Sequence, residues 1–167
     1  GTNKTVGVDT LSLADGANGG IASNYTLAGG THLLTVNKAV ISINGTRQYD
    51  GSTNTLPADL SLNNLQGGEN LTLTGNGTIS DKNVATGKTL DVSGLTLGNG
   101  SGGTPGLSSN YKLDGGTHTF NVTKKDITFS GSRVYDGTTT VTSSDLVTND
   151  TTSGETLAFS GSGTVSS

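Results

Sequence analysis

Cysteine, methionine and tryptophan are absent from this 167-residue sequence, and aromatic residues make up only 4% of it. Without cysteine, the sequence offers no disulfide, no thiolate metal ligand and no thiol nucleophile. No apolar run approaches the roughly 20 residues that a membrane-spanning helix needs, so we expect no membrane insertion. The nine lysines and arginines are scattered along a chain of net charge −4, so we expect no binding of nucleic acid.

The rarest residue types recur at one fixed spacing. The four tyrosines form two pairs 86 residues apart, and the only histidines, arginines and glutamates form one such pair each. These pairs are Tyr25 with Tyr111, Tyr49 with Tyr135, His32 with His118, Arg47 with Arg133, and Glu69 with Glu155. Self-similarity at a fixed period is typical of a repeated structural unit. The sequence therefore predicts tandem units of about 86 residues.

Longer matches indicate where each unit begins and ends. Residues 58–80 align without a gap on residues 144–166 at the same offset. Only residues 38–123 form a complete repeat. We interpret residues 1–37 as the C-terminal part of a preceding repeat and residues 124–167 as the N-terminal half of a following one.

The junction between repeats is short. The stretch TFNVTKKDITFSGS (119–132) leads from the last expected strand of one unit to the first strand of the next. It contains neither a long Gly/Ser-rich linker nor a Pro-rich one. We therefore expect closely coupled units that form an elongated rod.

Apolar and polar residues alternate in most of the runs between turns. Ile41 and Ile43 are two residues apart, as are Phe120 and Val122. This period places apolar side chains on one face of a strand. The NG, DG, GG and SG pairs between the runs supply turn positions of positive φ. The pattern predicts an all-β fold whose units are small β-sandwiches or β-grasp-like domains, with one helical turn indicated by Pro57.

A pentapeptide motif occurs near the start of each unit, as RQYDG (47–51) and RVYDG (133–137). Its Arg and Tyr share a strand face, and its Asp-Gly pair begins a turn in which the aspartate accepts a backbone N–H bond from two residues on. We expect the tyrosine to close the core end of the unit, and the arginine to lie across a ring or pair with a carboxylate. The expected structural signature comprises Arg47, Tyr49, Asp50, Gly51, Arg133, Tyr135, Asp136 and Gly137, together with Tyr25 and Tyr111.

With these motifs the chain resembles the YDG repeat domains of large bacterial surface adhesins, which are found in filamentous-haemagglutinin-like secreted proteins. The resemblance rests on YDG itself, on SDKNVATGKTLDVSGLTL (80–97) and on NYKL (110–113). It implies a repeated β-domain in a long extracellular stalk at the bacterial cell surface. It also implies that the repeat carries no catalytic residues.

Other kinds of site find little support. His32 and His118 occupy equivalent GGTH positions, and no strained nucleophile motif accompanies them, so we expect no enzyme activity. The eleven aspartates raise the alternative of bound calcium, but none forms a D-x-D-x-D-G loop, so we expect no cofactor. Glu69 and Glu155 lie beside glycines, which predicts exposed loops.

These observations favour a structural role as a stalk or spacer repeat of an extracellular bacterial adhesin or a biofilm matrix protein. Its partners would be neighbouring repeats or other copies of itself. One alternative is a surface module that binds host or matrix glycan, although the few aromatic residues follow strand patterns and are expected in cores. Another is a head-to-tail filament, in which the C-terminal half of one chain completes its sheet with the N-terminal part of another.

Overall fold

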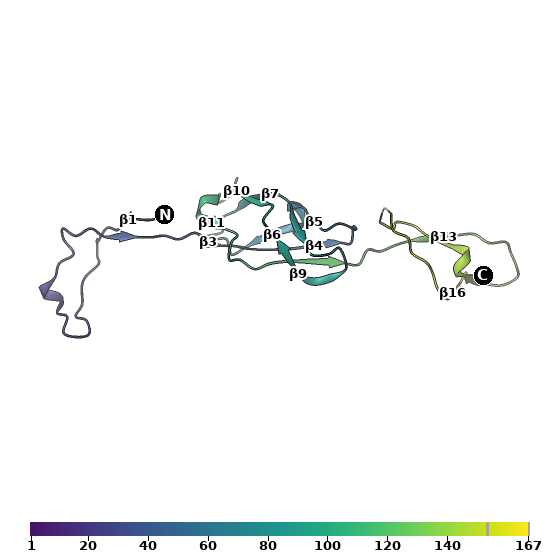
Figure 1. The fold of residues 1–167 in the computed structure, drawn as a ribbon, viewed down its shortest axis with the longest axis horizontal. Helices are drawn as coiled ribbons and strands as arrows, with labels where there is room; N and C mark the ends of the chain where they lie inside the picture. Colours follow the sequence, from purple (N-terminus) through teal and green to yellow (C-terminus); the bar gives the residue numbers. More distant parts are fainter. Residues whose placement is uncertain (153, 167) are drawn as a thin grey trace.

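The fold of the described residues is all-β, as the sequence predicts. The structure is a computed structural model that describes residues 1–152 and 154–166. Its regular elements are strands and helical turns of three residues, and no helix among them could cross a membrane. Figure 1 shows residues 38–123, the central unit, between an N-terminal segment (residues 1–37) and a C-terminal segment (residues 124–167).

The central unit is built on one curled sheet of six strands. These are β4 (Ser42–Gln48), β5 (Asn54–Thr55), β6 (Leu60–Asn63), β8 (Gly77–Ile79), β9 (Ala85–Asp91) and β12 (His118–Thr123). Their order across the sheet is β5-β8-β9-β12-β4-β6. Strands β4 and β12 are parallel, and the other neighbours are antiparallel. Two smaller pairs complete the unit, β7 (Leu71–Gly75) with β10 (Leu95–Asn99) and β3 (Ala39–Val40) with β11 (Tyr111–Lys112).

Alternating side chains of this sheet form the hydrophobic core. Ile43 of β4 and Phe120 and Val122 of β12 are almost completely buried, whereas Asn44, between the apolar positions of β4, is exposed. The buried cluster comprises Ile43, Ile79, Leu90, Leu95, Phe120 and Val122. The predicted period of two is confirmed for β4 and β12, because each strand presents one apolar face to the core.

The two end segments repeat strand pairings of the central unit. Their strands are β1 (Lys4–Thr5), β2 (Leu33–Leu34), β13 (Phe129–Gly131), β14 (Thr140–Thr142), β15 (Leu146–Thr148) and β16 (Ser162–Thr164). Residues 4–16 match residues 88–100 at an offset of 84, two less than the rest of the repeat. Lys4 accordingly lies opposite Leu34 in β1–β2 as Lys88 lies opposite Phe120 in β9–β12. Pairs β13–β15 and β14–β16 have the registers of β4–β6 and β5–β8, shifted by 86 residues. The repeat seen in the sequence thus recurs in the strand pairing.

Apolar side chains of the end segments lie open to solvent. Leu34, at the repeat position of Phe120, is 55% exposed, and Phe129, at the position of Ile43, is 59% exposed. The N-terminal segment holds counterparts of β9 and β12, and the C-terminal segment holds those of β4, β5, β6 and β8. Each segment therefore lacks the strands that cover these positions in the central unit.

Short 3-10 turns also recur in the repeat. They are η1 (Ala22–Asn24), η2 (Pro57–Asp59), η3 (Ser108–Asn110) and η4 (Ser143–Asp145). The helical turn expected at Pro57 is present, and its counterpart η4 forms without a proline. In both turns an aspartate accepts a backbone N–H bond from three residues earlier, Asp59 from Leu56 at 3.3 Å and Asp145 from Thr142 at 2.8 Å. The aspartate that accepts this bond is therefore a shared stabilising feature of the two turns.

Candidate functional site

The Asp-Gly pairs of the YDG motif form the expected turns. Asp50 Oδ1 accepts a hydrogen bond from the backbone N–H of Ser52 at 2.9 Å, and Asp136 Oδ1 accepts one from Thr138 at 2.9 Å. The glycine that follows each aspartate has φ of +79°, a conformation that glycine adopts without steric cost. The two motifs therefore have the same local geometry.

Arg47 joins the YDG turn to the core. Its guanidinium carbon lies 5.5 Å from the ring centroid of Phe120, and its Nη2 lies 3.1 Å from Asp50 Oδ1. The guanidinium also donates to the backbone carbonyls of Ser52 and Asn54. The sequence left open whether this arginine covers a ring or pairs with a carboxylate, and it does both.

Arg133 makes the equivalent ion pair in the C-terminal segment. Its Nη1 lies 2.7 Å from Asp136 Oδ1. Hydrogen bonds from the Thr138 backbone and hydroxyl, together with this arginine, lower the pKa of Asp136 to about 2. The Asp136 carboxylate is therefore charged at neutral pH.

Tyr49 lies where the central unit meets the C-terminal segment. It packs against the hydrophobic cluster, and its hydroxyl donates to Glu155 Oε1 of the C-terminal segment. Lys82 Nζ donates to the same oxygen and lies 5.9 Å from the Tyr49 ring centroid. A Cβ atom added to Gly51 would lie 2.5 Å from Thr152 Cγ2 of the same segment. The tyrosine, lysine and glycine thus form one closely packed junction with Thr152 and Glu155 of the C-terminal segment.

The other glutamate, Glu69, accepts a hydrogen bond from a different tyrosine. Tyr111 is almost fully buried, and its hydroxyl donates to Glu69 Oε2 at 2.6 Å. The same hydroxyl accepts the backbone N–H of Gln66 at 3.1 Å. Because the nearby carboxylate disfavours a phenolate, the pKa of Tyr111 is raised above its usual value. Glu69 therefore anchors the end of a core tyrosine within its own repeat.

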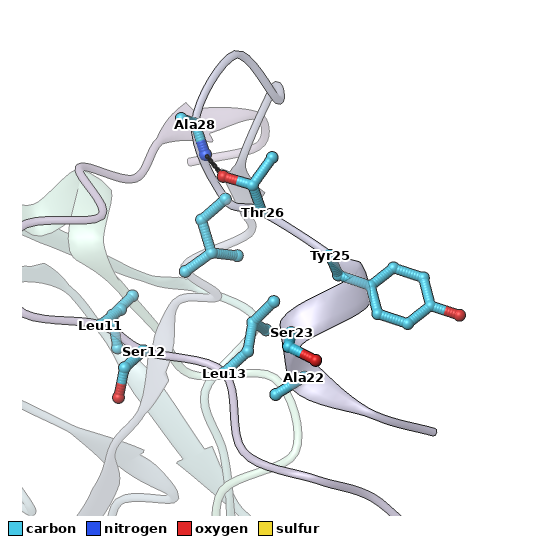
Figure 2. A pocket seen from close by; sticks show the side chains of 9 residues that line it. Leu11, Ser12, Leu13, Ala22, Ser23, Tyr25, Thr26 and Ala28 are labelled. Atoms are coloured by element: carbon cyan, nitrogen blue, oxygen red, sulfur yellow. Dashed lines mark hydrogen bonds between the residues drawn. The ribbon is translucent and has the colours of Figure 1, made fainter. Parts of the chain in front are cut away.

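The other two signature tyrosines are exposed, which corrects the expectation that every tyrosine fills a core. Tyr135 is 89% exposed and Tyr25 is 69% exposed. In Figure 2 the Tyr25 ring points away from the hollow that Leu11 and Leu13 line. The hydroxyl of Tyr49 bonds to Glu155, 106 positions later, and that of Tyr111 bonds to Glu69, 42 positions earlier. The positions at the same distances from Tyr135 and Tyr25 fall outside residues 1–167.

Sequence reasoning also missed the role of the glutamates. Their glycine neighbours predicted exposed loops, but both side chains are partly buried and hydrogen-bonded to tyrosines. The signal that could have found them is the shared 86-residue spacing of the only tyrosines and the only glutamates. Lys82 is in one of the motifs that carry the resemblance, but nothing local in the sequence pairs it with Glu155.

The histidine of the central unit, His118, is hydrogen-bonded to the backbone through both ring nitrogens. His118 Nδ1 accepts the backbone N–H of Ile43 at 3.1 Å, and Nε2 donates to the carbonyl of Leu113 at 3.0 Å. Both ring nitrogens are therefore engaged in the neutral tautomer that carries its proton on Nε2. Across residues 1–152 and 154–166, no group of three or more histidine or acidic side chains is placed to hold a metal ion.

The family follows from the repeat and the geometry of its YDG turn. Residues 34–119 match the YDG domain family, and these 86 residues are more than half of the chain. The chain belongs to the YDG domain family. No curated protein and no solved structure matches it.

The Glu155–Lys82 contact predicts how the junction responds to pH. The Lys82 ammonium, followed by the Tyr49 hydroxyl, lowers the pKa of Glu155 below its usual 4.5, and Glu155 raises the pKa of Lys82 above its usual 10.5. A lowered carboxyl pKa stabilises the folded state above pH 4.5, and this contribution is lost as the pH falls through the folded-state value. A raised ammonium pKa stabilises the folded state below pH 10.5, and this contribution is lost as the pH rises through its folded-state value.

We therefore expect the difference in melting temperature between the chain and its Glu155→Gln variant to be largest between pH 4.5 and 10.5. It should shrink on both sides of that window. Comparison with the variant removes the pH response of other pairs, such as Lys88 with Asp81. A difference in melting temperature that does not change with pH would contradict the assignment.

Proposed function

We propose that the chain is a structural stalk or spacer built of YDG repeats, in an extracellular adhesin of the bacterial surface or in a biofilm matrix protein. The observation that carries the proposal is the junction at Tyr49, where the central unit contacts the next partial repeat through Glu155. A spacer needs successive domains that hold each other in place, and two of the three residues in this contact, Tyr49 and Glu155, recur with the repeat. The proposed partners are neighbouring repeats.

Two further features support a spacer. The backbone N–H of Tyr49 bonds to the carbonyl of Thr123 at 2.9 Å, so the YDG strand is tied to the residue at which the central unit ends. The C-terminal strands reuse the registers of the central unit, and a repeated register allows one unit to be added after another. The extracellular bacterial location is proposed from the resemblance to surface adhesins.

Small-angle X-ray scattering of the chain tests the spacer. We expect a skewed pair-distance distribution, with a maximum dimension well beyond that of a compact particle of 16.7 kDa. Glu155→Gln is expected to shift the distribution by loosening the junction, and Asp114→Asn, in an exposed pair with Lys112, serves as the control. A near-spherical distribution would reject the proposal.

The open apolar faces of the end segments favour a second candidate, a head-to-tail filament. Phe129 and Leu34 are exposed at positions whose counterparts are buried in the central unit. The C-terminal segment of one chain and the N-terminal segment of another carry complementary sets of strands, so they could complete one sheet. An average mass that rises with concentration in sedimentation experiments would support this candidate, and a constant monomer mass would exclude it.

A further inference from the structure

Glu69 and Glu155 occupy the same position of the repeat but accept hydrogen bonds from different partners. Glu69 accepts the Tyr111 hydroxyl through Oε2, whereas Glu155 accepts Tyr49 and Lys82 through Oε1. A carboxylate offers about four acceptor sites on its two oxygens. One glutamate at this position could therefore accept hydrogen bonds from two repeats at once. Its own repeat would contribute a tyrosine, and the preceding repeat would contribute a tyrosine and a lysine.

The surroundings of the two glutamates correspond. A groove beside Glu155 is lined by Lys124, Lys125 and Thr152 of the C-terminal segment and by Tyr49 of the central unit. A second groove, beside Glu69, is lined by the residues 86 positions earlier, which are Lys38, Ala39 and Gln66. The second groove thus carries its glutamate on an equivalent wall, and the tyrosine that lines it, Tyr111, belongs to the same unit as Glu69.

The N-terminal segment borders the second groove. Gly1 and Val36 line the second groove, and the N–H of Val36 bonds to the carbonyl of Gly1 at 2.8 Å. This pair corresponds to Ala85 and Val122, which lie opposite each other in β9 and β12. Lys82 lies three residues before Ala85, so the lysine of an upstream repeat would enter beside Gly1.

We propose that Glu69 is the acceptor site for the tyrosine and lysine of another YDG repeat joined upstream, and that each such glutamate bridges two successive repeats. The phenol and the ammonium of the upstream repeat bind the carboxylate oxygen of Glu69 that Tyr111 does not use. This inference rests on the proposed tandem function. It adds a defined contact that would hold each pair of repeats in one orientation.

The test uses the full chain lengthened by one repeat, with residues 1–123 followed by residues 38–167. In this lengthened protein residues 38–123 occur twice. The second copy of Glu69 is at the same distance along the chain from the first copies of Tyr49 and Lys82 as Glu155 is from Tyr49 and Lys82 in the original chain. Tyr49→Phe in the first copy and Glu69→Gln in the second copy are measured singly and together by chemical denaturation. We expect the double variant to depart from additivity by at least about threefold in the unfolding equilibrium constant.

The original chain supplies both controls. There, Tyr49→Phe and Glu69→Gln should be additive, because Tyr49 bonds to Glu155. Tyr111→Phe and Glu69→Gln should couple, because they remove the two ends of one hydrogen bond. If a variant is too unstable to measure, the carboxyl carbon-13 shift of the second-copy Glu69 replaces the cycle, and it should move when the first-copy Tyr49 becomes phenylalanine.

Additivity in the lengthened chain, or an unmoved carboxyl shift, would overturn the inference. Scattering from the same lengthened chain separates this failure from failure of the spacer. An extended particle without coupling leaves the spacer in place and removes the glutamate bridge. A compact particle with coupling removes the spacer and keeps the bridge.

Discussion

Replacing Phe120 by alanine is expected to lower the free energy of unfolding of the central unit by about 4 kcal/mol. Phe120 is 0% exposed and lies in the hydrophobic cluster, under the guanidinium of Arg47. Alanine would remove the buried ring and leave a cavity in the hydrophobic cluster on one face of the sheet. Chemical denaturation followed by circular dichroism measures the change.

Leu34→Ala is the matched control for Phe120. Leu34 has the same place in the repeat, and its strand pairs in the same register, but more than half of its side chain is exposed. Its loss should change the free energy of unfolding by no more than about 0.5 kcal/mol. Equal losses for the two variants would mean that the open apolar face of the N-terminal segment is covered in solution.

Replacing Gly75 by alanine is expected to cost about 3 kcal/mol. Gly75 ends β7 with φ of +83°, and an added Cβ would overlap the carbonyl oxygen of Gly94. That oxygen belongs to the backbone turn that leads into β10, so it cannot move aside as a flexible side chain would. Thermal and chemical unfolding should both report the loss.

Gly161→Ala separates the two contributions to the cost of Gly75→Ala, which are the positive φ angle and the overlap of the added Cβ with a backbone oxygen. Gly161 is the counterpart of Gly75, with φ of +84°, but no atom lies within 4 Å of its added Cβ. It should show the conformational cost alone, about 1 kcal/mol. If Gly161→Ala cost as much as Gly75→Ala, the backbone conformation rather than the overlap would be the cause.

Local features of this structure could be predicted because they depend on neighbouring residues. The Asp50 turn follows from an aspartate before a glycine, and the burial of Ile43 and Phe120 follows from the alternation in their strands. The turn at residues 143–145 was not expected, because its segment contains β-branched residues and lacks the proline that accompanies Asp59 in the other copy. The aspartate that both copies share is the common local signal.

Contacts between distant residues could not be predicted in the same way. Tyr49 and Glu155 are 106 residues apart, and no local pattern reports which side chain will cover another across a junction. Alternation identifies the buried face of β4 but not that β12 will pair with it in parallel. Tyr135 lies in the same Arg-x-Tyr-Asp-Gly motif as Tyr49 and yet is exposed, because the burial of Tyr49 depends on a hydrophobic cluster and a glutamate that lie far from it in the sequence.

The parallel pairing of β4 and β12 has a mechanical consequence. A tensile force carried along the chain enters the central unit at the start of β4 and leaves it at the end of β12. The six residue pairs between these strands, from Ile43–His118 to Gln48–Thr123, lie along the direction of pull. Their evenly spaced hydrogen bonds are loaded in shear and share the force, whereas a hairpin pulled from its open end would break them one at a time.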